Sequence, residues 1–405
     1  MRAGARSSCY ASRMTSGNPQ TLDVAIAGAG PTGITLALAL RAELGPSLRV
    51  MVFDPALGRT TARDARASMI AADGRALLER IGAWPEDAAP VAGLRITDSG
   101  LDAAIRPTFL ELGEARPDGE PFAHMVSDAE LRARLAERAR AEAVGLVAQP
   151  IESHACEPGR VRLRLADGGE ATARLLVAAD GAGSPLRARE RIPTYAYAYD
   201  QTALVATLGH EAPHGGVAVQ HFLPGGPFAM LPLAGNVSSL VWSERRSEAE
   251  RIARADDETF LREAERRAGP DYGRLSLAGR RGAFPLRFVL ARRFVGSRLA
   301  LVGDAGHVVH PLAGQGFNLA LRDVKALARI VAEAARAGED IGSDAVLGGY
   351  ESARRFEVAS VAAATDALYR LFAAPGARGL RDVGMGLVDR APALKRRIVT
   401  AASGL

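Results

Sequence analysis

One glycine-rich turn constrains this chain more than any other feature. Residues 28–33 read Gly-Ala-Gly-Pro-Thr-Gly, which matches the pattern Gly-x-Gly-x-x-Gly. The apolar run Thr21–Ala27 predicts a buried strand before the turn, and Ile34–Leu44 has helical spacing after it. A second apolar run, Leu48–Phe53, ends at Asp54. Strand, glycine turn, helix, strand and acid is the order found in βαβ units that bind a dinucleotide.

Each part of this turn has an expected role. The glycines permit a tight turn and let the backbone approach a pyrophosphate at the helix N-terminus, so Gly28→Val should fill the space that the pyrophosphate needs. A carboxylate at the end of the second strand can accept hydrogen bonds from ribose hydroxyls. This site alone leaves both NAD and FAD open. The expected cofactor-binding residues here are Gly28, Gly30, Pro31, Thr32, Gly33 and Asp54.

Two later segments favour a flavin. Leu176–Gly181 reads as a strand that runs into Asp180-Gly181, although Asp-Gly also favours an ordinary β-turn. Arg298–Val302 reads as another strand, followed by Gly303 and Asp304, which could bond a ribityl hydroxyl. The glycine-rich loop 310–318 then opens a helix, whose N-terminal N–H groups would stabilise the negative charge of a reduced flavin.

Composition excludes several classes of protein. The 405 residues fit two globular domains. The two cysteines, Cys9 and Cys156, belong to no CxxC motif or His/Cys cluster, so a disulfide framework, a structural zinc site and an iron–sulfur centre are not expected. No metal site is therefore predicted, and a reducing compartment is expected. The formal charge is +5, but Lys325 and Lys395 are the only lysines and aromatic interleaving is missing, so nucleic-acid binding is not expected. The longest uncharged runs are Val24–Leu40 and Ala212–Ser243, and glycine and proline interrupt both, so neither is a credible membrane span.

The remaining chain predicts an α/β fold. Helices are expected at Arg63–Ile81 and at Asp128–Ala143, with Asp128 as N-cap. A hairpin is expected at residues 160–178, around Asp167-Gly168-Gly169. Tyr195–Trp242 alternates apolar runs with turn residues, which favours an antiparallel sheet. A helical stretch, Glu248–Arg267, follows, and two further helices are expected at Phe317–Ala335 and Tyr350–Phe372.

These elements predict a discontinuous Rossmann-like FAD-binding domain with an inserted, mostly antiparallel β substrate domain and a helical C-terminal region. The FAD-binding domain is assigned to residues 21–84, 126–187 and 284–330, the substrate domain to 85–125 and 188–283, and the C-terminal helices to 331–405. Residues 1–20 contain arginine and serine but no acid, and are expected to form a disordered leader, with an organellar presequence as the alternative.

Taken together, the motifs resemble those of a known family. The GAGPTG turn with Asp54, the AADGAGS segment with Arg187, and the segment LVGDAGHVVHPLAGQGFNLALRD resemble three fingerprints of the class A flavoprotein monooxygenases, which share the p-hydroxybenzoate hydroxylase fold. The segment HPLAGQGFNLALRD and the block HFLPGGPFAMLPL resemble the ubiquinone-biosynthesis hydroxylases more narrowly. Two departures are Gly306, where alanine is usual, and Asp128, which would put a carboxylate near the cofactor.

The resemblance implies the cofactor and the site residues. It implies FAD, O2 and either NAD(P)H or a ferredoxin-type reductant, with oxygen transferred to a phenol ring from a C4a-hydroperoxide. Pro311, Gly314 and Gly316 would form the loop over the flavin face. No histidine base is required, so His307 and His310 are expected to pack the loop. The further cofactor-binding residues implied are Arg66, Arg132, Asp180, Gly303, Asp304, Gly316, Phe317 and Asn318.

The substrate implied by the resemblance is a polyprenylated phenol. The inserted β domain would exclude water from the reaction, and its apolar strands supply candidates for a substrate channel, although plain sheet core explains them equally well. These candidates are Phe222, Leu223, Phe228, Met230, Leu231 and Leu233.

Such a substrate resides in a bilayer, so contact with a membrane or with a ubiquinone-biosynthesis complex is expected. The tail carries six basic residues between Arg378 and Arg397, interleaved with Leu, Val and Met. A solvated amphipathic helix is the alternative. The expected location is the bacterial cytoplasm with peripheral membrane association, and the mitochondrial matrix is the alternative.

Three other functions stay open. The first is hydroxylation of a small soluble phenol, for which a closed polar pocket is expected in place of a wide apolar channel. The second is reduction of double bonds by a flavoprotein similar to geranylgeranyl reductase. The third is a flavin-bound scaffold without catalysis. A flavin halogenase is disfavoured, because Trp84 and Trp242 are too far apart to form the WxWxIP signature of that group.

Overall fold

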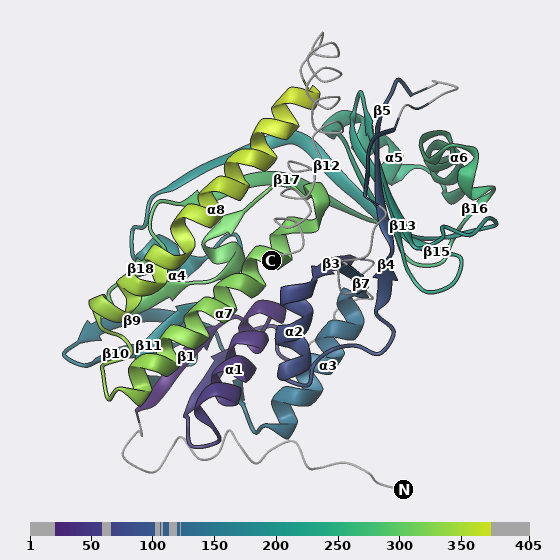
Figure 1. Ribbon diagram of the computed structural model, residues 1–405. Helices are drawn as coiled ribbons and strands as arrows, with labels where there is room; N and C mark the ends of the chain where they lie inside the picture. The colour runs from purple at the N-terminus through teal and green to yellow at the C-terminus, as the bar shows by residue number, and fades with distance from the viewer. Residues whose placement is uncertain are drawn as a thin grey trace, which may run out of the picture.

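The computed structural model describes residues 21–58, 66–101, 106, 108–112, 120–121 and 123–373. The predicted leader, 1–20, and the basic tail lie outside the described residues. The described chain forms three sheets, of which the two large ones lie in different parts of the molecule (Figure 1).

The first large sheet carries the glycine-rich turn. Its strand order is β18-β19-β11-β1-β2-β8, and the central strands run parallel, with β9 and β10 attached to β11 as an antiparallel extension. The predicted hairpin around Asp167-Gly168-Gly169 is confirmed by the pairing of β10 with β11. The strands are β1 Leu22–Ala27, β2 Val50–Phe53, β8 Gly145–Val147, β9 Ile151–Glu157, β10 Arg160–Leu165, β11 Glu170–Ala178, β18 Val295–Gly296 and β19 Leu299–Leu301.

Helices cover this sheet. Helix α1 (Pro31–Leu44) is buried from Gly33 to Leu40 and packs beside α7 (Gln315–Arg336), while α8 (Asp344–Ala373) packs on α7 (Figure 1). Helix α3 (Asp128–Ala141) flanks α1, and the short α4 (Pro185–Arg189) follows β11. None of the helices in the described residues is both long and apolar enough to cross a bilayer.

A small three-stranded sheet corrects one prediction. In place of a single helix at Arg63–Ile81, the described part of that segment forms β3 (Ala67–Ala71) and then α2 (Ala72–Arg80). Strand β3 pairs antiparallel with β7 (Ala123–Ser127), which also pairs with β4 (Ala89–Val91). The helical prediction was wrong because this pairing joins residues far apart in sequence, and such tertiary contacts override local propensity.

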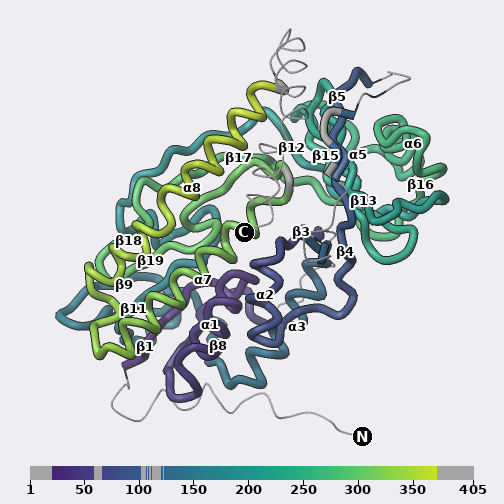
Figure 2. Tube along the Cα trace, in the orientation of Figure 1, coloured from purple at the N-terminus to yellow at the C-terminus, as the bar shows by residue number. Residues whose placement is uncertain are grey.

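The second large sheet is mostly antiparallel, as predicted for Tyr195–Trp242. Its order is β20-β17-β12-β15-β14-β13-β5-β6, with β16 beside β12. Figures 1 and 2 show β12 and β17 crossing from one part of the molecule to the other. The strands are β5 Gly93–Asp98, β6 Thr108–Leu112, β12 Thr194–His210, β13 Val217–Leu223, β14 Gly226–Pro232, β15 Val237–Arg245, β16 Leu275–Leu277, β17 Gly282–Ala291 and β20 His307–Val308.

Two helices, α5 (Arg246–Arg254) and α6 (Asp257–Ala268), cover one face of this sheet. The sequence predicted one helical stretch here, but the chain breaks at Ala255 because Asp256 caps α6 by accepting the Thr259 N–H at 2.7 Å. Strand β17 keeps the chain in the antiparallel sheet to Ala291, beyond the boundary predicted at 284, because β17 pairs with both β12 and β20.

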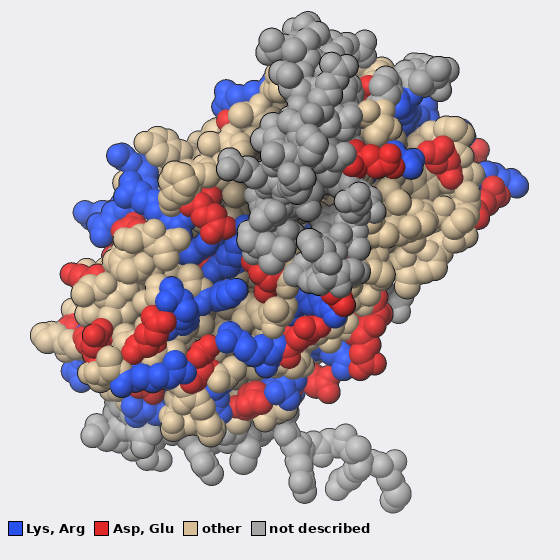
Figure 3. All heavy atoms as spheres, viewed as in Figure 1, with Lys and Arg blue, Asp and Glu red and all other residues tan. Residues whose placement is uncertain are grey.

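Charges of both signs are mixed over the face seen in Figure 3. Many belong to ion pairs along or between helices, such as Arg329 with Glu333 at 2.9 Å within α7 and Arg322 with Glu357 at 2.7 Å between α7 and α8. Exposed pairs such as Arg329 with Glu333 contribute little stability each, so the fold depends mainly on the apolar core beneath them.

Candidate active site

Four parallel strands end in one row. Ala27 at the end of β1 is in register with Phe53 of β2 on one side and with Ala178 of β11 on the other, and Ala178 is in register with Leu301 of β19. The segments that follow these ends therefore meet at one edge of the sheet, where open α/β sheets bind their ligands. The three fingerprint loops are brought together by this register.

The three glycines of the turn have different surroundings. Gly28 has φ +105°, and a Cβ there would lie 2.2 Å from the Ala179 carbonyl oxygen; a Cβ on Gly33 would lie 2.0 Å from the Gly28 carbonyl oxygen. Gly30 has no atom within 4 Å of its Cβ position. The reason predicted for Gly28→Val was therefore wrong, because its side chain would collide with Ala179, the residue that follows β11. Open space for a pyrophosphate lies at Gly30.

Asp54 fixes the same turn. One carboxylate oxygen accepts the Ala29 N–H at 2.7 Å and the other accepts the Ala56 N–H at 2.7 Å. Each oxygen retains a second lone pair, so a bond to a ribose hydroxyl stays a prediction. Pro31 begins α1, and Thr32 lies against the third loop, since a Cβ on Gly303 would come within 3.1 Å of its methyl group.

Asp304 lies in the loop after β19, in the short 3-10 turn η3 (Gly303–Ala305). Its side chain is exposed, yet burial by the surrounding protein raises the pKa of the carboxyl, against the opposing charges of His307, Arg287 and Arg66. A carboxylate with both properties lies in a recess that solvent enters. Burial likewise raises the pKa of Asp180, whose Oδ1 has no hydrogen-bond partner within the described residues.

Arg187 joins the second loop to the third. Its guanidinium donates to the Ala305 carbonyl at 2.7 Å and to the Ala182 carbonyl at 2.9 Å, and the Ser184 hydroxyl caps α4 by accepting the Arg187 N–H at 3.0 Å. The sequence marked Arg187 as part of a motif but assigned it no task. In the structure it holds the two Asp-bearing loops against each other.

Asp323, which the sequence reasoning missed, organises the third loop from behind. It is 2% exposed, and its carboxylate accepts the Gly303 N–H at 2.9 Å, contacts His307 Nε2 at 2.6 Å and accepts from Arg354 Nε at 2.8 Å. His307 thus packs the loop through Asp323. The available sequence signal was a lone carboxylate on the apolar face of a predicted helix.

At the start of α7, hydrogen bonds from the Asn318 side chain fix the backbone, and Gly316 leaves open space beside it. Gly314 has φ +65°, and Gly316 has no atom within 4 Å of its Cβ position. The Asn318 amide accepts from Ala71 N–H at 2.9 Å and donates to the carbonyls of Met69 at 2.7 Å and Gly314. The Asn318 side chain therefore binds backbone, and Phe317 packs against the main core. Any contact of either residue with a cofactor stays a prediction.

Two arginines predicted to bind the cofactor lie at the small sheet and at α3. Arg66 is exposed, with Nε 3.9 Å from Asp128 Oδ2 and its guanidinium 5.1 Å from the centre of the Phe284 ring. Asp128 also accepts from the Ser68 hydroxyl at 2.7 Å, and the N-cap position of α3 is Ser127, so the predicted cap was wrong. Arg132 Nε is buried without a partner among the described residues.

This recess fits a dinucleotide that carries a flavin. Gly30, Gly181 and Gly316, one on each of three loops, leave open space where a side chain would stand. Carboxylates of Asp180 and Asp304 can accept from hydroxyls of a ribityl chain, and two helix N-termini offer backbone N–H groups to negative charge. The donor and acceptor set therefore matches a polyhydroxylated, anionic cofactor.

A cavity of about 220 Å³ lies beside the loop that leads into α7. Phe222 and Leu223 line it, as predicted for a channel. Phe228 and Met230 do not, because they face α5 and α6 in a closed core, and Leu231 and Leu233 pack partly buried against another cluster. The cavity lining consists of Asp200, Gln201, Phe222, Leu223, Pro224, Gly225, Gly226, Pro227, Arg245, His310, Leu312 and Tyr369.

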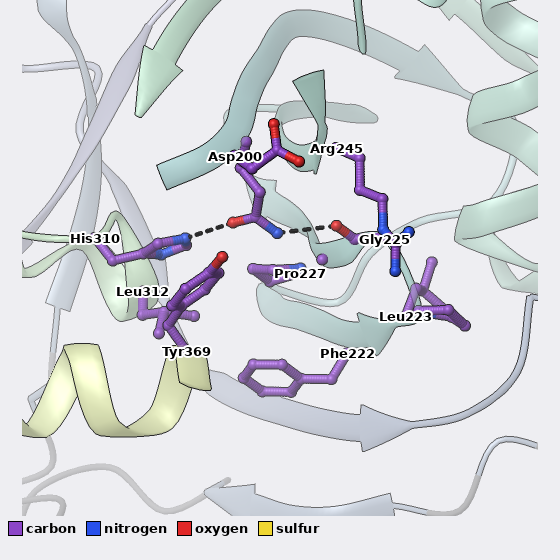
Figure 4. A pocket seen from close by; sticks show the side chains of 12 residues that line it. Asp200, Phe222, Leu223, Gly225, Pro227, Arg245, His310, Leu312 and Tyr369 are labelled. Carbon is purple, nitrogen blue, oxygen red and sulfur yellow. Dashed lines mark hydrogen bonds between the residues drawn. The ribbon is translucent and has the colours of Figure 1, made fainter. Parts of the chain in front are cut away.

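His310 and Gln201 both line this cavity and contribute polar groups to it, and Figure 4 shows His310 at its edge. Gln201 Nε2 donates to the Gly225 carbonyl at 2.9 Å, so its Oε1 faces His310 Nε2 at 3.0 Å and that nitrogen carries the hydrogen. Burial lowers the pKa of His310 to about 4, so the ring is neutral near pH 7. His310, expected only to pack its loop, also lines the cavity.

Comparison with known proteins identifies the family. The model of the FAD binding domain family matches residues 21–365. The chain is 41% identical over 401 residues to the ubiquinone hydroxylase UbiL of Rhodospirillum rubrum, covering 96% of this chain and 91% of UbiL. It is 35% identical over 280 residues to the mitochondrial ubiquinone biosynthesis monooxygenase COQ6 of Homo sapiens, covering 60% of each chain.

Solved structures confirm the predicted fold class. Pseudomonas aeruginosa PqsL in complex with 2-aminobenzoylacetate superposes with a TM-score of 0.72 at 24% identity, covering 90% of this chain and 99% of that chain. The p-nitrophenol 4-monooxygenase PnpA of Pseudomonas putida superposes with a TM-score of 0.74 at 18% identity, covering 95% and 98%. The chain belongs to the FAD binding domain family, within the ubiquinone-biosynthesis hydroxylase group of the class A flavoprotein monooxygenases.

Proposed function

We propose that this protein is an FAD-dependent monooxygenase that hydroxylates the aromatic ring of a polyprenylated phenol in ubiquinone biosynthesis. The observation that carries the proposal is the single row of four strand ends, where all three fingerprint loops meet, in a chain 41% identical to UbiL. The family supports the cofactor, and the names of the relatives support the substrate class.

Several residues are proposed to hold FAD. The backbone at Gly30 would contact the pyrophosphate, Arg66 and Arg132 would supply guanidinium groups to it, and Asp304 would bind the ribityl chain. Asp180 and the N-terminus of α7 would complete the recess. Bound FAD, reduced by NAD(P)H or a ferredoxin-type donor, supplies the chemistry by which one atom of O2 enters the ring.

One continuous segment connects the cofactor recess with the cavity. His310 and Leu312 line the cavity, and the chain passes through Pro311 and Gly314 directly into α7. Residues 311–316 would therefore lie where the cofactor recess meets the cavity, beside the reacting atoms of both the flavin and the substrate. We propose that this loop positions the ring and keeps water away from the reacting atoms.

The volume of the cavity favours a second candidate substrate. At about 220 Å³ it lies below the size usual for drug-sized ligands, and Asp200, Gln201, Arg245 and His310 make part of its wall polar. Hydroxylation of a small soluble phenol suits these dimensions. For a polyprenylated phenol, the cavity would hold the head group while the prenyl chain continues past the apolar residues Leu223 and Pro224.

The purified holoenzyme tests both candidates. Incubation with a nicotinamide donor, ¹⁸O2 and either a prenylated or an unprenylated phenol should yield a ring-hydroxylated product containing ¹⁸O, detected by mass spectrometry. Turnover of the prenylated phenol alone supports the first candidate. A product with a saturated double bond and no ¹⁸O would show a reductase, and a yellow protein that converts neither phenol would contradict a monooxygenase.

We also propose that the protein approaches the membrane surface through its basic tail. The six basic residues between Arg378 and Arg397 would be attracted to anionic lipids. Co-sedimentation with anionic liposomes should fall when the chain is ended at Ala373, the last described residue. Equal sedimentation of both forms would contradict the role of the tail and leave a protein partner to present the substrate.

A further inference from the structure

Three tyrosines meet where the C-terminal end of α8 reaches β12. The ring centres of Tyr197 and Tyr199 on β12 are 5.2 Å apart, and those of Tyr199 and Tyr369 on α8 are 4.6 Å apart. Burial raises the pKa of all three, so each hydroxyl keeps its proton near neutral pH. The three residues differ in what their hydroxyls contact.

Two of the hydroxyls are bound within the protein. Tyr197 and Tyr199 both donate to Asp366 Oδ1, the latter at 3.3 Å, and Arg370 donates to Asp366 Oδ2 at 2.7 Å. These contacts attach the last turns of α8 to β12. They also fix the position of Tyr369, which lies between Asp366 and the end of the helix.

The third hydroxyl faces the cavity. The Tyr369 ring stacks on the His310 ring, with centres 5.2 Å apart and planes 22° apart, and it lines the cavity beside Leu312. Figure 4 shows its oxygen at the end of the ring that points towards the other residues lining the cavity. Within the part of the chain that the structure describes, no hydrogen-bond partner is recorded for this oxygen.

Its polar neighbours are already engaged. His310 Nε2 contacts Gln201 Oε1, and Gln201 Nε2 donates to Gly225. Opposite this wall, Phe222 and Pro227 offer apolar surface to a flat ring (Figure 4). An aromatic ring bound here, with one oxygen substituent, would find Tyr369 as a donor.

We propose that Tyr369 is a substrate-binding residue whose hydroxyl donates a hydrogen bond to the oxygen on the substrate ring and so fixes the orientation of the ring. This inference rests on the proposed function. It assigns α8 a direct part in selecting phenols over rings without oxygen, because a donor left unpaired in the cavity disfavours a ligand that cannot accept.

Two single-atom deletions test the proposal. Tyr369→Phe removes only the hydroxyl in the cavity, and Tyr199→Phe removes a hydroxyl of the same cluster that contacts Asp366. The dissociation constants of 2-prenylphenol and of prenylbenzene, which lacks the oxygen, are measured from the flavin absorbance of the oxidised holoenzyme. We expect Tyr369→Phe to weaken the binding of 2-prenylphenol about five- to tenfold and not to weaken the binding of prenylbenzene, which the unpaired donor of the wild type disfavours.

The remaining outcomes decide against the proposal. Equal affinity of wild type and Tyr369→Phe for 2-prenylphenol overturns it, as does an equal loss for both ligands, which would indicate ring packing. If Tyr199→Phe loses as much affinity for 2-prenylphenol as Tyr369→Phe, the tyrosine cluster contributes only by ordering the end of α8, and not through a bond from Tyr369 to the substrate. If the wild-type holoenzyme binds neither ligand, the proposed function fails as well, which separates the two conclusions.

Discussion

The buried carboxylate of Asp323 on α7 accepts a hydrogen bond from the backbone N–H of Gly303 at 2.9 Å. Gly303 has φ +61° and directly precedes Asp304, so this bond fixes the turn that presents the Asp304 carboxylate to the recess. Arg354 of α8 holds Asp323 at 2.8 Å from the other side. Helices α7 and α8 thus determine the geometry of the loop that follows β19.

Asp323→Asn should destabilise the protein and release FAD. The substitution removes the fully buried carboxylate from Arg354, which keeps its pair with the less buried Glu357, so the destabilisation should be at most about 3–5 kcal/mol, the value seen when a buried pair loses one partner. Urea unfolding measures the loss, and the ratio of flavin to protein absorbance measures the cofactor. Arg329→Ala, which breaks the exposed pair with Glu333, is the control and should cost less than about 1 kcal/mol.

Stability should fall in mild acid because His310 is buried as a neutral ring. Its pKa is lowered to about 4 from 6.5, so the unfolded chain binds the proton first, and the contribution of this residue is lost as the pH falls from 6.5 towards 4. Between pH 6.5 and 5 this amounts to about 2 kcal/mol. His310→Gln should reduce the pH dependence of the unfolding free energy by that amount. Parallel curves for both proteins would contradict the assignment.

Asp323 should affect stability at a lower pH than His310 does. Burial works to raise its pKa, but His307 and Arg354 outweigh burial and lower it below 3.8. The stability it contributes is therefore present above 3.8 and is lost as the pH falls further, through its value in the folded protein. Below pH 4, the free energy of unfolding of the wild type should fall more steeply with decreasing pH. The contribution from Asp323 to this fall should be absent in Asp323→Asn.

Substitutions at Gly28 and Gly30 should have different consequences. Gly28→Ala places a methyl group 2.2 Å from the Ala179 carbonyl oxygen at a positive φ, so at least about 2 kcal/mol of stability should be lost. A Cβ at Gly30 meets no atom within 4 Å, and the residue has an ordinary φ of −65°, so Gly30→Val is compatible with the backbone there. It should leave thermal stability of the apoprotein unchanged and abolish FAD binding. Retention of FAD by Gly30→Val would remove the pyrophosphate from this position.

Asp304→Asn should weaken FAD binding without unfolding the protein. The carboxylate would accept hydrogen bonds from ribityl hydroxyls, and bonds to a charged group contribute about 1.5–3 kcal/mol, or roughly tenfold or more in affinity. Burial raises the pKa of this carboxyl, so its charge does not stabilise the fold, and the apoprotein melting temperature should not fall. A fully yellow variant would contradict the assignment.

Local sequence patterns predicted the units that a short stretch of chain can specify. Strand β1, helix α1 and strand β2 form within three residues of the predicted bounds, because apolar spacing and a glycine turn act between near neighbours. The fingerprints likewise identified the family and FAD.

Strand pairing between segments that are far apart in the chain could not be predicted from the sequence. The residues of β3 read as helix, since their partner β7 lies more than fifty positions away. The apolar residues of β14 suited a substrate channel and a sheet core equally well in the sequence, and only the position of α5 and α6 decided that Phe228 and Met230 belong to the core.

The sequence by itself determined the βαβ unit, the cofactor class and the kind of residue at each loop. The tertiary structure decided which side chains work together: Asp323 behind Gly303, Arg187 between two loops, and Tyr369 beside His310. The physical reason is that strand register and helix packing set these contacts, and both depend on burying apolar surface across the whole domain rather than on neighbouring residues.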